Sequence, residues 1–153
     1  MATDKVSIRW SGKRQFVGWD VAGHGVVMDA PAAYGGEGTG ARPLEIVLYG
    51  LAACTGMDVV SILEKKRQPF TGLSMEVTAI QREDEFPKIY TRIELVYVVT
   101  GTGVKPDAVA RAIELSEEKY CSVRGMFGPQ VEIVTSFRVE DGSTTTGPEG
   151  VEE

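Results

Sequence analysis

The sequence predicts an α+β fold with a largely antiparallel sheet. Two kinds of periodicity predict it: several segments alternate apolar and polar residues as half-buried strands do, and two others repeat apolar residues every three or four positions as helices do. Along the chain they give three strands, a helix, two strands, a helix and a last strand. Because the strands are grouped rather than alternating with helices, we expect an α+β fold and not a parallel α/β fold.

Three short strands are expected at the start of the chain, over residues 5–10, 14–21 and 25–31. The sequences SGK and AGHG between them supply turn residues, so the strands should form two tight hairpins. The stretch AAYGGEGTGAR that follows contains four glycines and is expected to be a mobile loop that acts as a lid or a connection.

The first helix is expected over residues 43–67 and begins at Pro43, whose missing N–H costs nothing in the first turn. Apolar residues form one helical stripe, and the residues outside that stripe are also apolar or small over its first turns. A helix that is apolar all round must be covered on both sides. One sheet face and one amphipathic helix cannot provide that cover, so we expect a homodimer to supply it.

The second half of the chain predicts a β-hairpin, a helix and a final strand. The hairpin joins residues 73–79 and 89–101 through the turn REDEFPK. The helix runs from Pro106 to near Cys121, and the last strand covers residues 131–139. We expect a single domain over residues 1–141, followed by a polar, disordered tail over residues 142–153.

Composition excludes several classes of function. A net charge of -6 and a pI near 4.9 argue against a nucleic-acid partner, which needs clustered basic residues. The N-terminus lacks the pattern of a secretion signal, so we expect a cytoplasmic protein. The apolar run over residues 46–57 is shorter than the roughly 20 residues that cross a bilayer, and Asp58 ends it, so no membrane span is expected.

The chain offers few residues for chemistry. Its only histidine, His24, lies in the turn AGHG, where an exposed turn residue is the favoured interpretation. Two cysteines without a Cys-x-x-Cys motif lack the spacing of a zinc site, so no metal is expected. Cys54 lies in the apolar stretch LAACTGMDVVSIL, and Cys121 ends the second helix beside Lys119 and Arg124. Either cysteine can be an inert core thiol or a reactive one.

The stretches PLEIVLYGLAACTGMDVVSILEKKRQ and AIELSEEKYCSV resemble the two cysteine motifs of the OsmC/Ohr family, the osmotically inducible and organic-hydroperoxide-resistance proteins. The two motifs are most similar to those of the OsmC-like branch of the family. The resemblance covers roughly residues 4–141 and implies a sheet wrapped around a central buried helix in an intertwined homodimer. It also implies a thiol-dependent peroxidase that acts on small organic hydroperoxides.

The resemblance assigns roles to four residues. Cys54 matches the cysteine that attacks the peroxide, and Cys121 matches the one that resolves it to a disulfide. Arg14 matches an arginine that would favour the Cys54 thiolate and stabilise the leaving alkoxide. Glu45 lies near the position of a glutamate that would hold Arg14 in a bidentate pair. Each of these two residues also has an alternative without a catalytic role. Arg14 can be a solvated charge of the hairpin, and Glu45 can be an acid favoured by the dipole at the N-terminus of the helix.

The same resemblance implies that no cofactor is needed and that an external dithiol or a lipoyl-bearing protein is the reductant. Apolar neighbours would favour organic peroxides by burying an alkyl group; the candidates are Tyr49, Leu51, Met57 and Phe127. The stretches CTGMD and CSVRG depart from the well-studied hydroperoxide reductases, and Asp58, one turn after Cys54, disfavours a thiolate unless the acid is paired. The alternative is a non-enzymatic protein that binds a small hydrophobic ligand in an interfacial pocket.

Overall fold

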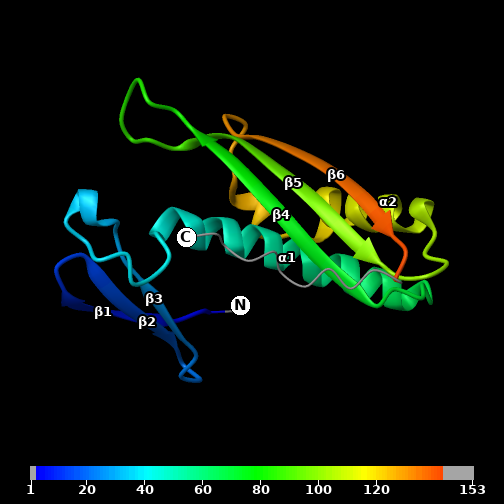
Figure 1. The fold of residues 1–153 in the computed structure, drawn as a ribbon, viewed down its shortest axis with the longest axis horizontal. Coiled ribbons are helices and arrows are strands. Elements are labelled where there is room, and N and C mark those ends of the chain that lie inside the picture. Colours follow the sequence, from blue (N-terminus) through cyan, green and yellow to red (C-terminus); the bar gives the residue numbers. More distant parts are fainter. Residues whose placement is uncertain (1–2, 143–153) are drawn as a thin grey trace. The chain divides into compact units, whose positions relative to one another are not determined.

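A computed structural model describes residues 3–142 of the chain. It divides into two compact units, one up to Tyr49 and one from Gly50 onward (Figure 1). The order of the long elements is three strands, a helix, two strands, a helix and a strand. This order confirms the predicted α+β fold. Eleven residues of the predicted tail, 143–153, lie outside the described part of the chain.

The first unit contains an antiparallel three-stranded sheet built from β1 (Val6–Gly12), β2 (Gln15–Asp20) and β3 (Gly25–Met28). The register pairs Ile8 with Gly18 and Phe16 with Met28, as two hairpins require. The three predicted strands are therefore confirmed.

The turn between β2 and β3 is fixed by one carboxylate. Asp20 accepts hydrogen bonds from the backbone N–H groups of Ala22 and His24, and the Nδ1 atom of His24 lies 2.7 Å from its Oδ2 atom. His24 is exposed. It is therefore a turn residue, as the sequence indicates.

The glycine-rich segment after β3, for which a mobile loop was expected, is hydrogen-bonded to Asp29. The buried Asp29 carboxylate accepts hydrogen bonds from the backbone N–H groups of Ala30, Glu37 and Thr39 and from the Thr39 hydroxyl. These bonds, those from Thr39 first, lower the pKa of Asp29 to about 2. The glycines allow close approach: a Cβ at Gly40 would lie 2.5 Å from the Val27 carbonyl oxygen.

The second unit contains β4 (Gly72–Gln81), β5 (Tyr90–Thr100) and β6 (Glu132–Glu140), with β5 in the centre. β4 pairs with β5 antiparallel, whereas β6 pairs with β5 in parallel. The largely antiparallel expectation holds, but the described strands form two sheets and not one. Strand periodicity reports only which side chains are buried, so it could not show which strands pair.

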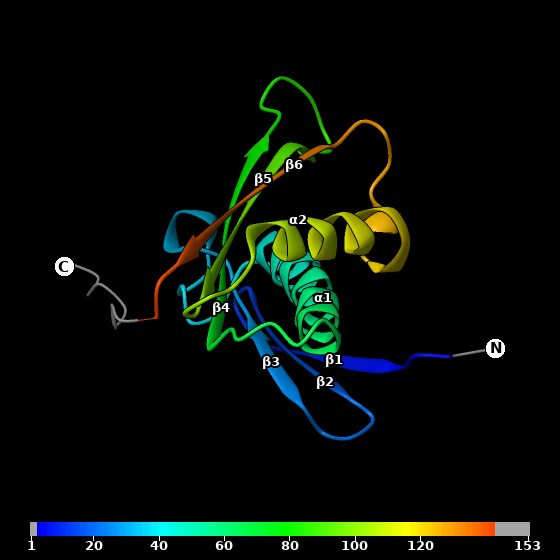
Figure 2. The same ribbon diagram turned by 90° about the vertical axis from the view of Figure 1, so that its right-hand side faces the viewer.

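Two helical segments accompany this sheet, and Figure 2 shows both on the same side of it. One is the part of α1 (Pro43–Lys65) from Gly50 onward, and the other is α2 (Pro106–Leu115). The helical segment that begins with α2 ends next to Cys121, as predicted. Its last part is a π-helix, η2 (Ser116–Tyr120), and a short 3-10 turn, η3 (Arg124–Met126), follows.

Within the described part of the chain only one stripe of α1 is buried, and the second copy expected to cover the rest of the helix stays a prediction. The stripe comprises Leu51, Thr55, Gly56, Val59 and Leu63. Apolar side chains outside this stripe are exposed in the described part of the chain: Met57 is 72% exposed and Tyr49 is 60% exposed.

Within residues 3–142, α1 is also the one helix whose length and apolar composition would allow it to cross a membrane, a property that core helices of globular proteins share. Its buried stripe packs on the sheet: a Cβ at Gly56 would lie 3.3 Å from the sulfur of Met75 on β4. The fold thus uses α1 as a core helix.

Candidate functional site

The two cysteines meet in the second unit. Cys54 lies in the middle of α1 and Cys121 directly follows η2, yet the two thiols lie close enough for Cys54 to influence the ionisation of Cys121. Both are free thiols; Cys54 is half-buried and Cys121 is buried. The fold therefore brings together two cysteines that are 67 residues apart in sequence (121 - 54 = 67).

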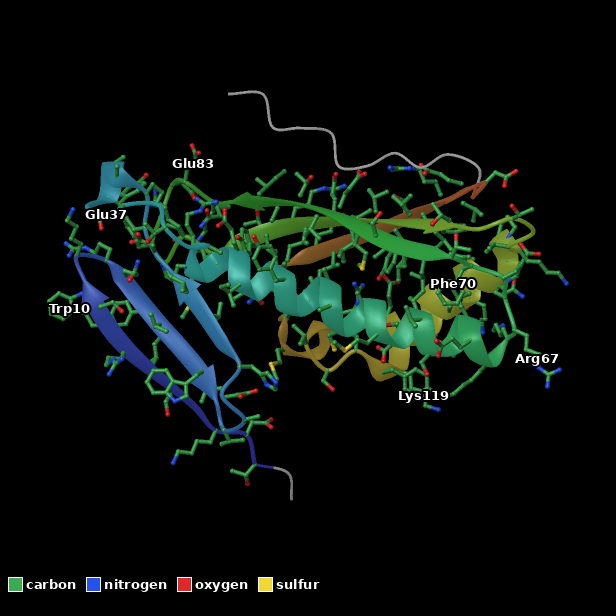
Figure 3. All side chains as sticks on the ribbon, turned by 60° about the horizontal axis from the view of Figure 1, so that its bottom comes forward. Trp10, Glu37, Arg67, Phe70, Glu83 and Lys119 are labelled. Atoms are coloured by element: carbon green, nitrogen blue, oxygen red, sulfur yellow. The ribbon has the colours of Figure 1, made fainter. Side chains whose placement is uncertain are left out.

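The backbone around Cys121 holds its sulfur in a defined place. The N–H of Cys121 donates to the carbonyl of Ser116 at 2.8 Å, which closes the last turn of the π-helix. The N–H of Arg124 donates to the Cys121 sulfur at 3.4 Å. Lys119, in the same segment, is exposed and labelled in Figure 3. Single turns of π-helix are frequent at functional sites, because the extra residue redirects the chain that follows.

The surroundings of Cys121 favour its protonated form. Burial raises the pKa of the Cys121 thiol, and the neighbouring Cys54 and the charge of Asp58 raise it further. The N–H of Arg124 acts in the opposite direction because it stabilises a thiolate. The Cys121 thiol is therefore disfavoured as a thiolate.

A chain of hydroxyl groups lies beside the cysteines. The Thr55 hydroxyl oxygen is 2.7 Å from the Tyr97 hydroxyl and 2.8 Å from the Ser116 hydroxyl. Ser116 in turn donates to a carboxylate oxygen of Asp58 at 2.8 Å. Because the one proton of Ser116 goes to Asp58, Thr55 must donate to Ser116, and Tyr97 must donate to Thr55.

This chain gives Asp58 a definite partner and keeps Tyr97 neutral. The Asp58 carboxylate is bound by a hydroxyl rather than by a cation, so its negative charge is still felt at Cys121. Burial raises the pKa of Tyr97 to about 12, and the Thr55 hydrogen bond opposes that shift in part. Tyr97 is thus a fixed hydrogen-bond donor at neutral pH.

A charged pair flanks Cys121. Nη1 of Arg124 and Oε1 of Glu117 are 3.5 Å apart, and both atoms are buried. Neither atom has a hydrogen-bond partner among the residues described. The pair links η2 to the turn after Cys121, so it fastens the segment that carries the cysteine.

Two pockets lie around this site. One, of about 420 Å³, is lined by Cys121 and its sequence neighbours, including Glu117, Tyr120, Arg124 and Gly125. The other, of about 350 Å³, is lined by Asp58, Ile62, Lys65, Leu115 and Tyr120, among others.

The structure does not form the expected pair between Arg14 and Glu45. Glu45 instead binds Arg42, accepting from its backbone N–H at 2.8 Å and from two guanidinium nitrogens at 3.0 and 2.8 Å. These bonds lower the pKa of Glu45. Arg14 is exposed, and its Nη1 donates to the carbonyl of Lys13. Arg42 takes the place of Arg14 because it lies three residues from Glu45 at the start of α1.

The four apolar residues expected to contact the alkyl group of the peroxide do not gather at one place. Leu51 is only 1% exposed and belongs to the core, whereas Tyr49 and Met57 are exposed residues of α1. Phe127 is half-buried just after η3. None of the four lines the two pockets around the cysteines.

The sequence did not indicate most of the polar groups that lie around the cysteines. Arg124 was noted as a cation, but it contributes its backbone N–H to the sulfur. Thr55, Tyr97 and Ser116 carry no sequence signal, because buried hydroxyls and core residues share the same periodicity. No group of three or more potential metal ligands occurs within residues 3–142.

Comparisons with known proteins bear on the whole chain. The family model described as OsmC-like protein matches residues 36–136, which span both units. The protein called Protein YhfA from Escherichia coli strain K12 is 40% identical over 133 residues, which cover 86% of this chain and 95% of that protein.

Solved structures share the fold. The crystal structure of a hypothetical protein from Aquifex aeolicus VF5 matches with a TM-score of 0.80 and 33% identity, covering 92% of this chain and 98% of that one. The organic hydroperoxide resistance protein OhrB of Bacillus subtilis matches with a TM-score of 0.62 and 20% identity, covering 90% of this chain and 98% of that one. At that identity the likeness to OhrB concerns the fold alone. The chain belongs to the OsmC-like protein family.

Proposed function

We propose that the protein is a thiol-dependent peroxidase that reduces organic hydroperoxides through Cys54 and Cys121. The observation that carries the proposal is the neighbouring pair of free thiols from α1 and the end of η2. The names of fold relatives such as OhrB support the choice of an organic hydroperoxide as substrate.

The environments of the two thiols support different roles for them. Cys54 is half-buried, so a peroxide can reach it, whereas only 6% of Cys121 is exposed. The raised pKa of Cys121 disfavours that residue as the attacking thiolate. Since the thiolate is the nucleophile, Cys54 is the attacking residue and Cys121 the resolving one.

The proposed reaction has two steps. The Cys54 thiolate attacks the terminal oxygen of the hydroperoxide, the O–O bond breaks, and the alkoxide leaves and takes up a proton as an alcohol. Cys54 is then a sulfenic acid. The thiol of Cys121 attacks its sulfur and expels water, which forms the disulfide before further oxidation occurs.

Arg14 remains our candidate for stabilising the leaving alkoxide, although Glu45 is engaged by Arg42. Tyr49, Leu51, Met57 and Phe127 remain candidates for holding the alkyl group. The exposed apolar side chains of α1, with Met57 at 72% exposure, support a homodimer, because a second copy would cover them. We propose the cytoplasm as the compartment, an external dithiol as the reductant, and no metal or cofactor.

The test is a single turnover followed by intact mass. Fully reduced protein receives one equivalent of cumene hydroperoxide, beside Cys54→Ser and Cys121→Ser variants. The proposal expects a rapid loss of two hydrogens in the wild-type chain and in neither variant. If both thiols survive an excess of peroxide, the peroxidase is refuted, and the alternative of a protein that binds a small hydrophobic ligand takes its place.

A further inference from the structure

The pocket beside Cys121 bears on how the disulfide would be reduced. A reducing thiolate can attack either sulfur, and the sulfur that it does not attack becomes the leaving group. Exposure alone would favour attack at Cys54, because Cys54 is the less buried of the two. The 420 Å³ pocket is lined by Cys121, and Cys54 is not among its lining residues.

We propose that a small, uncharged dithiol binds in the pocket beside Cys121 and attacks the Cys121 sulfur, so that Cys54 leaves as the thiolate. This inference rests on the proposed function, since it needs the disulfide between Cys54 and Cys121. It assigns the pocket to the reductant and separates the path of the reductant from that of the peroxide.

The volume and charge of the pocket define the chemical class of the reductant. About 420 Å³ lies within the range of roughly 300–1,000 Å³ typical of small-molecule sites. Its lining contains two acids, Glu117 and Glu118, and two bases, Lys119 and Arg124, so the formal charges cancel. Glu117 and Arg124 are paired with each other. A strongly charged thiol gains nothing there, and a neutral dithiol meets no repulsion.

Two features make Cys121 the attacked sulfur. The better leaving group is the thiol of lower pKa, and burial raises the pKa of Cys121 above its usual value. The N–H of Arg124, 3.4 Å from the Cys121 sulfur, holds that sulfur in place and stabilises the negative charge that develops as the entering thiolate adds. Release of Cys54 as a thiolate also returns it in the form that attacks the next peroxide.

The dithiol would reduce the disulfide in two steps. The thiolate of the dithiol forms a bond to the Cys121 sulfur while the bond between the two cysteines breaks and its electron pair leaves with Cys54. The second thiol of the reductant then attacks its own sulfur bound to Cys121, which closes a cyclic disulfide. Cys121 leaves as a thiolate and takes up a proton. Two electrons pass from the dithiol to the protein.

The test uses two glycines whose positions are open. A Cβ at Gly125, which lines the pocket, or at Gly50, one turn before Cys54 on α1, would meet no atom within 4 Å. Gly125→Leu therefore narrows the pocket, and Gly50→Leu places the same side chain next to Cys54. Gly125→Ala is the matched control for the change of backbone.

Each full-length variant is oxidised with diamide, so that disulfide formation does not depend on peroxidase activity, and is then reduced with dithiothreitol at equal oligomeric state. We expect Gly125→Leu to slow reduction by about tenfold or more, with Gly125→Ala and Gly50→Leu within about threefold of wild type. Slowing by Gly50→Leu alone, or equal rates in all variants, would overturn the inference.

A second experiment identifies directly which cysteine sulfur the reducing thiol attacks. The diamide-oxidised chain is treated briefly with 2-mercaptoethanol, quenched in acid with N-ethylmaleimide, and digested. The expected adduct lies on Cys121, with the maleimide on Cys54; the reverse labels would refute the proposal. Failure of cumene hydroperoxide to form the disulfide would refute the peroxidase instead, so the two failures are distinguishable.

Discussion

Replacing Thr55 by valine removes the central hydroxyl of the buried chain that runs from Tyr97 to Asp58. Thr55 is 2% exposed, and its oxygen lies 2.7 Å from Tyr97 and 2.8 Å from Ser116. Valine keeps the shape but offers no acceptor to the Tyr97 proton. Ser116 still donates to Asp58, so the damage is concentrated at Tyr97.

The direction of the hydrogen bonds from Tyr97 to Asp58 determines how much unfolding free energy each variant loses. In Thr55→Val the fully buried Tyr97 hydroxyl has no acceptor, and with the lost bond to Ser116 the free energy of unfolding should fall by about 2–3 kcal/mol. Tyr97→Phe leaves Thr55 donating to Ser116 and should cost about 1 kcal/mol. The double variant has no unpaired hydroxyl proton, so it should cost only about 2 kcal/mol, a coupling energy of about 1–2 kcal/mol.

Urea unfolding of the reduced protein measures all four members of this cycle, at one protein concentration because an oligomer would couple stability to concentration. Additive effects within about 0.5 kcal/mol would show that the two hydroxyls do not depend on each other. A loss larger in Tyr97→Phe than in Thr55→Val would refute the assigned direction of the hydrogen bonds.

Three further predictions concern the loop of the first unit and the segment around Cys121. Because the folded-state pKa of Asp29 is lowered from 3.8 to about 2, its contribution to stability is present above about pH 4 and is lost as the pH falls through 2. Amide-exchange protection of Glu37 and Thr39 should fall over that range in the wild type and already be lost at neutral pH in Asp29→Ala; unchanged protection in the variant would refute the anchor. Gly36→Ala would press its Cβ into the Ala30 carbonyl and should lower Tm. Gly50→Ala, in open space on α1, should leave Tm unchanged or raise it, and equal Tm values for the two variants would contradict this. Glu117→Gln leaves Arg124 without its ionic partner and should cost about 1–2 kcal/mol in urea unfolding, against less than about 0.5 kcal/mol for the exposed Glu118→Gln; similar costs would count against the pair.

Periodicity was enough to predict the elements of the fold. The alternation in residues 73–79 lies within the observed β4, that in residues 131–139 begins one residue before β6, and Pro43 does begin α1. Pairing was not predictable, because the parallel register of Tyr97 with Phe137 depends on where the chain returns after α2. The π-helix Ser116–Tyr120 was equally hidden, since one extra residue per turn barely alters the apolar pattern.

The site was predictable only where residue type carries chemistry. Cys54 and Cys121 were identified by their motifs, and the structure brings them together. The Glu45 partner was not predicted, because Arg42, three residues away at the start of α1, competes with an arginine from the turn between β1 and β2. Asp58 was expected to disfavour a thiolate; its charge acts on Cys121, while Ser116 binds its carboxylate.

Trapping of the sulfenic acid tests the central claim most directly. Reduced protein is mixed with cumene hydroperoxide in the presence of dimedone, and the labelled cysteine is identified by mass. The account predicts a dimedone adduct on Cys54 that accumulates in Cys121→Ser and is nearly absent in the wild type, where Cys121 removes the sulfenic acid first. An adduct on Cys121 in Cys54→Ser at a comparable rate, or no adduct on Cys54 in Cys121→Ser, would contradict it.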